Sequence, residues 1–207
     1  MFTGIIREVG GIRAVRHRAG VTVIDVDAPV IAPGLGIGNS VAVNGVCLTV
    51  TALAGGRFSA DLSPETVRAT TARRWRAGDR VHLEPSLRVS DALGGHFVLG
   101  HVDAIGRVVR IARLGEARQV TVGATAAVLA QLLPKGSIAL DGVSLTVDGG
   151  PFDHSFTVTL IPETLRATCL SALRHGDLVN LEVDVLAKAG RRRTGLTAQD
   201  VRKYGWQ

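Results

Sequence analysis

The chain has 207 residues, of which 46% are apolar and 20% are charged, an ordinary globular composition that excludes a disordered or fibrous chain. It contains no run of about 18 apolar residues, so we expect no membrane-spanning segment and no membrane partner. The formal net charge of +6 makes nucleic acid a partner to consider, but no aromatic stacking motif accompanies the arginines, and we expect a solvated basic surface instead.

Short strands separated by turns are predicted along most of the chain. Alternating apolar and polar residues indicate strands within residues 40–50, 57–63, 79–87, 155–161 and 177–185. The Asn44-Gly45 pair inside the first of these suits either a hairpin turn or a bulge. Short helices are predicted after Pro64 and Pro162, and another over residues 124–133. Strands at this spacing are typical of small β-barrels.

An internal repeat organises the sequence. SVAVNGVCLTV at 40–50 matches SIALDGVSLTV at 137–147 in seven of eleven positions, and LSPETVRATT at 62–71 matches LIPETLRATC at 160–169 in seven of ten. GDRVHLE at 78–84 returns as GDLVNLE at 176–182, and Gly4 and Gly10 return as Gly100 and Gly106. Because the offset stays between 96 and 98 over all these anchors, the chain is a tandem duplication of a unit just under 100 residues long.

The repeat defines the expected domains. We expect a first barrel over residues 1–95, a second over 96–187 and a C-terminal tail over 188–207. The tail lacks strand alternation and begins with glycine and three arginines. Two interpretations of the tail stay open, a short helix capped by Thr197 and ending near Val201, or a frayed basic segment.

Five motifs carry a family resemblance. MFTGII at the start, VNGVCLTV at 43–50, LGGHFV followed by GHVD within 93–103, KGSIALDGVSLTV at 135–147 and the paired PET segments occur in this order. Together with the duplication, they resemble riboflavin synthase of the α-chain type, the two-barrel lumazine-binding family, over about residues 1–188.

The resemblance implies an all-β fold of two six-stranded Greek-key barrels. It also implies a transferase that converts two molecules of 6,7-dimethyl-8-ribityllumazine into riboflavin and 5-amino-6-(ribitylamino)uracil by four-carbon transfer, without a separate cofactor. The expected assembly is a homotrimer with a site between barrels of neighbouring subunits, and lumazine synthase is a candidate partner. The alternative is a non-catalytic lumazine- or flavin-binding paralogue. Retention of His101, Cys47, Ser144 and Lys135 favours the enzyme.

Differences between the repeats indicate where the two lumazines are treated differently. His101 corresponds to Ile5, and an imidazole has a pKa near neutrality, as the base that removes a proton from the C7 methyl of the donor needs. Cys47 corresponds to Ser144, and either could attack C7 of the acceptor or position a water that does so. Lys135 corresponds to Gly38 and resembles the lysine that reaches the adjoining subunit's substrate.

Further candidates are less direct. Ser40 suits a substrate-orienting role, and Asp184 could orient a hydroxyl or the base. His96 is five residues from His101, so on a continuous strand the two side chains would point to opposite faces, which disfavours a shared metal. A hinge or packing role for His96 is as plausible as a direct one.

The resemblance implies a set of substrate-contacting residues drawn from both repeats. These are Gly4, Ile5, Ile6, Cys47, Leu48, Thr49, Asp61, Leu62, Ser63, Pro64, Glu65, Thr66, Gly100, His101, Val102, Lys135, Ser144, Leu145, Thr146, Thr159, Leu160, Ile161, Pro162, Glu163 and Thr164.

The cysteines and the N-terminus bear on metal content and location. Cys47 and Cys169 are too few for a disulfide framework or a structural zinc site, and we expect no metal. Charge and glycine appear too early in MFTGIIREVG for the apolar core of a signal peptide, so a cytoplasmic protein is expected.

The sequence departs from the family pattern at two places. Gly190 and Arg191 to Arg193 replace an apolar-faced helix that commonly forms the trimer contact, so we expect a helix interrupted at Gly190 and a weak or salt-dependent oligomer. Leu99 and Ala104 stand where many relatives have a polar or small residue and a glycine, and both flank His101.

Overall fold

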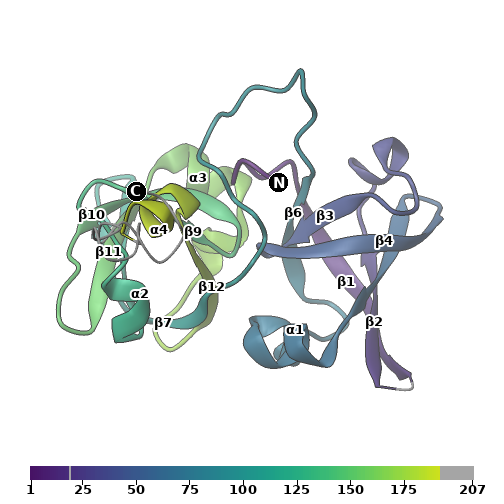
Figure 1. Ribbon diagram of the computed structural model, residues 1–207, viewed down its shortest axis with the longest axis horizontal. Helices are drawn as coiled ribbons and strands as arrows, with labels where there is room; N and C mark the ends of the chain where they lie inside the picture. Colours follow the sequence, from purple (N-terminus) through teal and green to yellow (C-terminus); the bar gives the residue numbers. More distant parts are fainter. Residues whose placement is uncertain (19, 192–207) are drawn as a thin grey trace, which may run out of the picture.

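The computed structural model, which describes residues 1–18 and 20–191, contains two closed antiparallel β-barrels of six strands each (Figure 1). The first barrel has the strand order β1-β2-β5-β4-β3-β6, and the second repeats it with β7 to β12 in the corresponding places. The two identical topologies confirm the predicted fold class and the duplication.

The first barrel comprises β1 (Glu8–Arg18), β2 (Val21–Asp27), β3 (Ser40–Val43), β4 (Val46–Ala54), β5 (Arg57–Leu62) and β6 (Arg80–Pro85), with the short helices η1 (Ala32–Gly34), α1 (Pro64–Ala69) and η2 (Thr71–Arg74). The second comprises β7 (Ala104–Leu114), β8 (Ala117–Gly123), β9 (Ser137–Leu140), β10 (Val143–Gly149), β11 (Ser155–Leu160) and β12 (Leu178–Val183), with α2 (Ala126–Leu129), α3 (Pro162–Ala167), η3 (Cys169–Ala172) and α4 (Val185–Arg191).

Each barrel has its own hydrophobic core because alternate residues of every strand point inward. Ile24, Phe58 and Leu83 are buried in the first barrel, and Phe156 and Leu181 are buried in the second. A third, smaller cluster joins the two halves and contains Phe2, Ala42, Val98 and Ala139. The barrels therefore pack against each other as well as around their own interiors.

The Asn44-Gly45 pair forms the turn between β3 and β4, so the hairpin alternative is the correct one. Both residues have positive φ, and Asp141-Gly142 repeats the turn between β9 and β10. The two turns meet at the barrel junction, where a Cβ on Gly45 would lie 2.6 Å from the amide nitrogen of Gly142. Glycine is needed here both for its backbone conformation and for the close approach.

Two counterparts in the repeat, His82 and Asn180, link the barrels. His82 Nδ1 donates to the Asp141 carbonyl at 2.9 Å, and His82 Nε2 accepts from the Cys169 amide at 2.8 Å. Asn180 reverses the arrangement, since its Nδ2 donates to the Asn44 carbonyl and its Oδ1 accepts from the Thr71 amide, both at 2.8 Å. Burial lowers the pKa of His82 to about 4, which keeps the ring neutral as both bonds require.

Some predicted elements differ in extent. The helix predicted over 124–133 is confined to α2, and turns lead from it to Pro134. The last described helix, α4, includes Gly190 and spans the expected boundary between the second barrel and the tail. The interpretations of Thr197 and Val201 concern residues outside the described part of the chain. Among the described residues, no helix is long and apolar enough to cross a membrane.

Candidate active site

The chain crosses between the barrels at two equivalent places. The Gly4 carbonyl accepts the Ser144 amide of β10 at 2.8 Å, and the Gly100 carbonyl accepts the Cys47 amide of β4 at 2.9 Å. The two crossing segments also pair with each other through Phe2 and Val98. Each barrel is therefore completed by residues that lead into the other barrel.

Glycine permits this close contact. Gly4 and Gly100 have φ values of 76° and 79°, and a Cβ on either would lie about 2.6 Å and 2.5 Å from the Cβ atoms of Ser144 and Cys47, respectively. A larger residue would be strained by its backbone conformation and would also push the crossing segment away from the strand. The repeat therefore keeps Gly4 and Gly100 where the predicted site residues meet.

A buried glutamate holds each crossing segment. Glu84 of β6 accepts hydrogen bonds from the amide and hydroxyl of Thr3, both at 2.7 Å, and from the amide of Gly4 at 2.9 Å. Glu182 of β12 accepts from the amides of Leu99 and Gly100 at 2.7 and 3.0 Å. Burial raises the pKa of both carboxyl groups, that of Glu182 to about 7, while these donors oppose the shift.

Sequence reasoning missed this pair of glutamates. Their signal was available, since Glu84 and Glu182 are identical at an offset of 98 and close the GDRVHLE and GDLVNLE motifs. The motifs indicated turns and strands, but they did not reveal that these two carboxylates point at backbone amides outside their own strands.

The first barrel brings together three of the predicted segments. The pairing of β4 with β5 ends at Val50 and Ala60, so Cys47–Thr49 and Asp61–Leu62 are the next residues of neighbouring strands. Beyond the last β4–β5 pair, the Gly100 carbonyl accepts the Cys47 amide of β4, and Val102 packs against the core of the first barrel. We call this set, with Ser63–Thr66 at the start of α1, the first half-site.

The second barrel builds an equivalent second half-site. The register of β10 with β11 at Val147 and Val158 places Ser144–Thr146 next to Thr159–Leu160, and α3 begins directly after Ile161. Here the Gly4 carbonyl accepts the Ser144 amide of β10, and Ile6 packs against the core of the second barrel. The structure thus divides the predicted substrate-contacting residues, apart from Lys135, into two symmetric sets.

The helix starts differ between the half-sites. Ser63 caps α1, because its Oγ accepts the Thr66 amide at 3.1 Å and lies 3.0 Å from the Thr66 hydroxyl. Ile161 occupies the same place before α3, caps nothing and is 55% exposed. Thr66 is thus engaged by its own helix cap, whereas Thr164 presents an amide without a side-chain cap.

The two predicted histidines have opposite environments. His101 is exposed, and none of the described residues hydrogen-bonds to its ring. His96 is 7% exposed, and its Nδ1 lies 2.7 Å from Ser144 Oγ, while its Nε2 is buried without a described partner. Burial lowers the pKa of His96, and the negative charge of Asp184 opposes this shift. The two histidines do not share a continuous strand, since residues 99–103 form no strand.

The remaining candidates lie around these half-sites. Lys135 has a φ of 62°, which a non-glycine residue rarely adopts, and its ammonium pairs with Asp148 at 3.4 Å. Asp184 accepts the Leu186 amide at the start of α4, and Ser40 pairs with Thr49 across β3 and β4. No group of three or more His, Cys, Asp or Glu among the described residues is placed to hold a metal ion.

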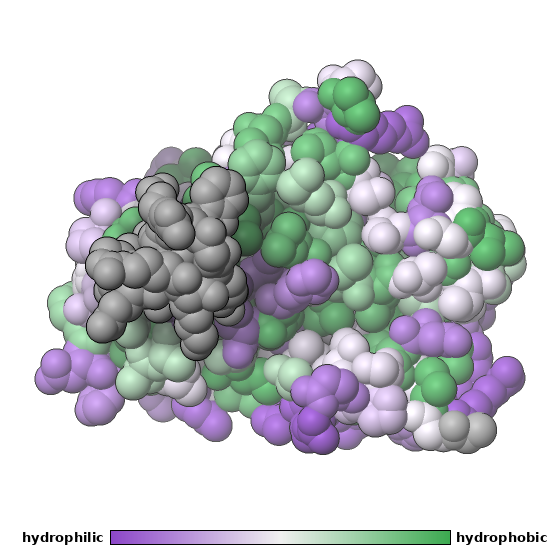
Figure 2. Space-filling view, in the orientation of Figure 1, coloured by the Kyte–Doolittle hydropathy of each residue, from purple (hydrophilic) through white to green (hydrophobic). Residues whose placement is uncertain are grey.

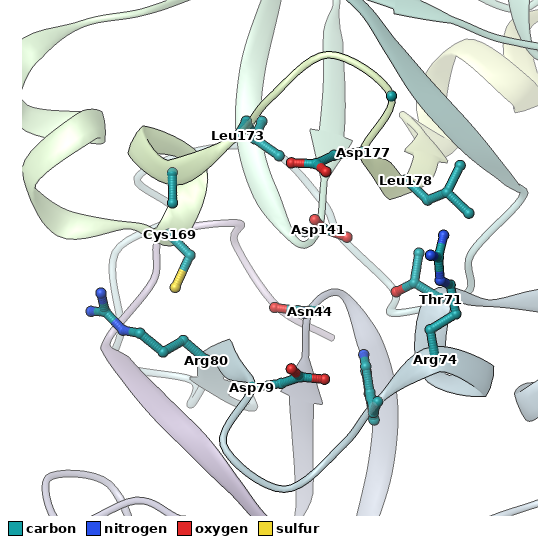
Figure 3. A pocket seen from close by; sticks show the side chains of 13 residues that line it. Asn44, Thr71, Arg74, Asp79, Arg80, Asp141, Cys169, Leu173, Asp177 and Leu178 are labelled. Atoms are coloured by element: carbon teal, nitrogen blue, oxygen red, sulfur yellow. The ribbon is translucent and has the colours of Figure 1, made fainter.

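A cavity of about 530 Å³ at the barrel junction is separate from both half-sites (Figure 3). Asn44 and Asp141 lie in its centre, Asp79 and Asp177 face each other across it, and Cys169 comes from η3. None of the predicted site residues lines it. This cavity is thus a feature of the barrel junction.

The comparisons with known proteins agree with this architecture. A family model described as a lumazine binding domain matches residues 3–86 and 99–184. Riboflavin synthase of Bacillus subtilis (strain 168) is 38% identical over 188 residues, covering 91% of this chain and 87% of that protein. Riboflavin synthase of Mycobacterium tuberculosis (strain ATCC 25618 / H37Rv) is 40% identical over 191 residues, covering 91% and 95%.

Solved structures support the fold independently. LumP complexed with riboflavin superposes with a TM-score of 0.80 at 24% identity, and LumP complexed with 6,7-dimethyl-8-(1'-D-ribityl) lumazine does so with 0.79 at 23%. Both alignments cover 88% of this chain and 99% of the other, and at this identity the likeness concerns the fold alone. The family match and the identities to riboflavin synthases carry the conclusion that this chain belongs to the riboflavin synthase family, built from two lumazine-binding domains.

Proposed function

We propose that this protein is a riboflavin synthase. It converts two molecules of 6,7-dimethyl-8-ribityllumazine into riboflavin and 5-amino-6-(ribitylamino)uracil by transfer of a four-carbon unit. The observation that carries the proposal is the pair of half-sites, equivalent in backbone and different in side chains, within a chain that belongs to this family. Two copies of one substrate need two similar pockets, and their unequal roles need unequal side chains.

The first half-site has the side chains for proton transfer. We assign His101 as the base that removes a proton from the C7 methyl of the donor, because its ring is exposed and free of described hydrogen bonds. Cys47 and Thr49 are the side chains of β4 beside it, since Gly100 is bonded to the Cys47 amide. The thiol of Cys47 could act as a nucleophile or position water at the acceptor.

In the second half-site we assign His96 as a positioning residue for Ser144. Where Nε2 carries the proton, Nδ1 accepts from the Ser144 hydroxyl and increases its nucleophilicity. Where Nδ1 carries the proton, the Ser144 hydrogen is free to bond to the substrate. In both tautomers the bond fixes Ser144 Oγ, whereas none of the described residues makes a corresponding hydrogen bond to the Cys47 thiol of the first half-site.

We propose that the complete site forms between subunits of a homotrimer. Figure 1 shows α1, which borders the first half-site, at the lower side of the molecule and α3, which borders the second, at the upper side. A half-site of one subunit would then face the other type of half-site in its neighbour, with Lys135 reaching across. Apolar side chains gather across the middle of the face in Figure 2, where the linker passes between the barrels, and Ile5 and Leu93 are partly exposed. Such a surface suits subunit contact.

We propose a cytoplasmic location, because Cys47 and Cys169 are both free thiols. Lumazine synthase, the partner that the resemblance implies, can be tested by co-sedimentation with the purified chain.

Turnover of the purified protein tests the activity. Incubation with 6,7-dimethyl-8-ribityllumazine, without added metal or nucleotide, should produce riboflavin, followed by its absorbance. Tight lumazine binding without riboflavin formation, under conditions in which a known riboflavin synthase works, would contradict the proposal and indicate a binding paralogue.

Complementation tests the shared site. His101→Ala disables the first half-site and Ser144→Ala the second, so each variant alone should have little activity. After subunit exchange, a mixture should regain activity, because the intact first half-site of one chain meets the intact second half-site of another. A mixture that stays as inactive as its components, with exchange shown by mass spectrometry, would place the whole site within one chain.

A further inference from the structure

The first barrel contains a second cavity, separate from the junction and from the crossing segments. Its volume is about 550 Å³, and it lies between the end of the β1–β2 hairpin and the segment formed by α1 and η2. Figure 1 shows α1 beside the lower end of β2. Val21, Pro64 and Val67 give it an apolar lining. Of the predicted lumazine-contacting residues, the cavity includes Pro64 alone.

The rest of the lining is cationic. Arg18, Arg68 and Arg73 border the cavity, and none of the described residues that line it is acidic. Arg68 pairs with Glu65, but the guanidinium groups of Arg18 and Arg73 have no hydrogen bond or ion pair with any described residue. Two uncompensated guanidinium groups beside an apolar surface fit an anion that also has an apolar part.

The second barrel shows that the fold does not require this cavity. Strand register makes Thr22 the counterpart of Arg118, because Thr22 pairs with Leu62 and Arg118 with Leu160. Arg118 Nη1 reaches across to the Ser171 carbonyl at 2.6 Å, and Ser171 is the counterpart of Arg73. The second barrel therefore fills the space with a long side chain from the strand. In the first barrel the small Thr22 leaves the space open, and Arg73 lies on the side of the cavity opposite Thr22.

His17 completes the open arrangement. Its Nδ1 lies 3.0 Å from Thr22 Oγ1, so Thr22 is held against the hairpin and away from α1. The cavity is thus kept open by contacts within the strands, independently of any ligand.

We propose that this cavity is a binding site for a small organic phosphate, a phosphate monoester with an apolar body. The phosphate carries a charge of about −1.5 to −2 at neutral pH, which matches the two unpaired guanidinium groups of Arg18 and Arg73. The apolar body rests on Val21, Pro64 and Val67. The substrate and products of the proposed reaction carry no phosphate, so this site does not depend on the proposed function.

Calorimetric titration of the full chain with three probes tests the proposal. Phenyl phosphate combines both features, inorganic phosphate lacks the apolar body and phenol lacks the charge. We expect one phenyl phosphate to bind per chain, at least about tenfold more tightly than inorganic phosphate, because the phenyl ring is transferred from water onto the apolar lining. Phenol should show no saturable binding. Equal affinities of phenyl phosphate and inorganic phosphate would overturn the proposal.

Two variants copied from the second barrel identify the site. Arg73→Ser removes one guanidinium, and should weaken phenyl phosphate binding at least about tenfold, the size of a charge-assisted contact to phosphate. Thr22→Arg adds a positive charge but fills the cavity, so it should also abolish binding. General electrostatic attraction predicts the reverse for Thr22→Arg, a gain in affinity, and that result would overturn the proposal.

Matched controls separate charge from location. Arg110→Ser removes an exposed arginine from the second barrel and Ala126→Arg adds one there, and neither should change phenyl phosphate binding. Circular dichroism establishes that each variant folds. If Thr22→Arg does not fold, Arg73→Ser decides alone, and unchanged affinity in that variant would overturn the proposal.

Discussion

The two barrels have the same backbone arrangement and use it for different chemistry. Glu84 and Glu182 hold the crossing segments in the same way, and Gly4 and Gly100 contact equivalent strands. The side chains of the half-sites differ, since the first has Cys47 and a His101 ring to which none of the described residues bonds, while the second has Ser144 bound to His96. The residues that fix the backbone are thus identical in both halves, whereas the residues of the half-sites differ between them.

This difference also explains how one duplicated chain can treat two identical molecules unequally. A perfectly symmetric pair of pockets would make both lumazines donors or both acceptors. The unequal side chains remove that symmetry without altering the barrels. Variants at the paired positions distinguish those that carry chemistry from those that carry stability.

The largest effect is expected from the histidine of the first half-site. His101→Ala should reduce kcat by about 10²–10⁴, the usual contribution of a general base, while lumazine binding measured by fluorescence titration stays nearly unchanged. Cys47→Ser should cost less than about tenfold, because the second barrel already uses serine at this position and a hydroxyl can still position water. The reverse order of effects would move the chemistry from His101 to Cys47.

The crossing glycines should come next. Gly4→Ala and Gly100→Ala each place a methyl group against β10 or β4 in a left-handed conformation, and each should lower the free energy of unfolding by roughly 2–5 kcal/mol. Gly115→Ala is the control, because Gly115 has a φ of 60° with open space around it, and it should cost roughly 1–2 kcal/mol. Denaturant unfolding measures all three, and equal losses would show that the close contact with the strands is unimportant.

The two buried titratable groups at the barrel junction, His82 and Asp141, should make stability depend on pH in opposite directions. The folded pKa of His82 is about 4 against an ordinary 6.5, so between these values the unfolded chain binds more protons and stability falls as the pH is lowered from 6.5 to 4. This loss should amount to at most about 3 kcal/mol. Asp141, whose pKa burial raises to about 7, acts in the opposite direction, so the comparison must isolate His82.

His82→Asn isolates this contribution by copying Asn180. Because asparagine does not titrate, the stability advantage of the natural protein over this variant should shrink on acidification through the same window. Parallel stability curves from pH 7 to pH 4 would contradict the assignment of a neutral, doubly bonded His82.

The smallest effect is expected at the helix caps. Ser63→Ala should destabilise the first barrel by about 1 kcal/mol, because the Thr66 amide loses its side-chain partner. Ile161→Ser should stabilise the second barrel by a similar amount, since it introduces the missing cap. Thermal unfolding of both variants measures the difference, and a destabilised Ile161→Ser would show that the exposed isoleucine makes contacts that the cap does not replace.

Much of the fold was predictable because its signals are local. The alternation within residues 40–50, the Pro64 and Pro162 helix starts and the 96–98 offset require no knowledge of distant contacts. The hairpin at Asn44-Gly45 was open to two interpretations, and the positive φ of both residues decides it. α4 includes Gly190, because glycine weakens a helix without necessarily ending it.

The composition of the site was accessible from the sequence, whereas its arrangement was not. The sequence by itself determined the duplication, the barrel class and the paired positions Cys47 and Ser144, because repeats and residue types are visible in the order of the amino acids alone. Tertiary structure decided that Gly4 lies on the second barrel and Gly100 on the first, and that Glu84 and Glu182 hold these segments. It also decided that His96 touches Ser144, whereas no described residue hydrogen-bonds to the ring of His101. These contacts join residues about 48 to 140 positions apart in the chain. Buried polar groups must find hydrogen-bond partners, and which groups are buried near one another is decided only when the barrels pack.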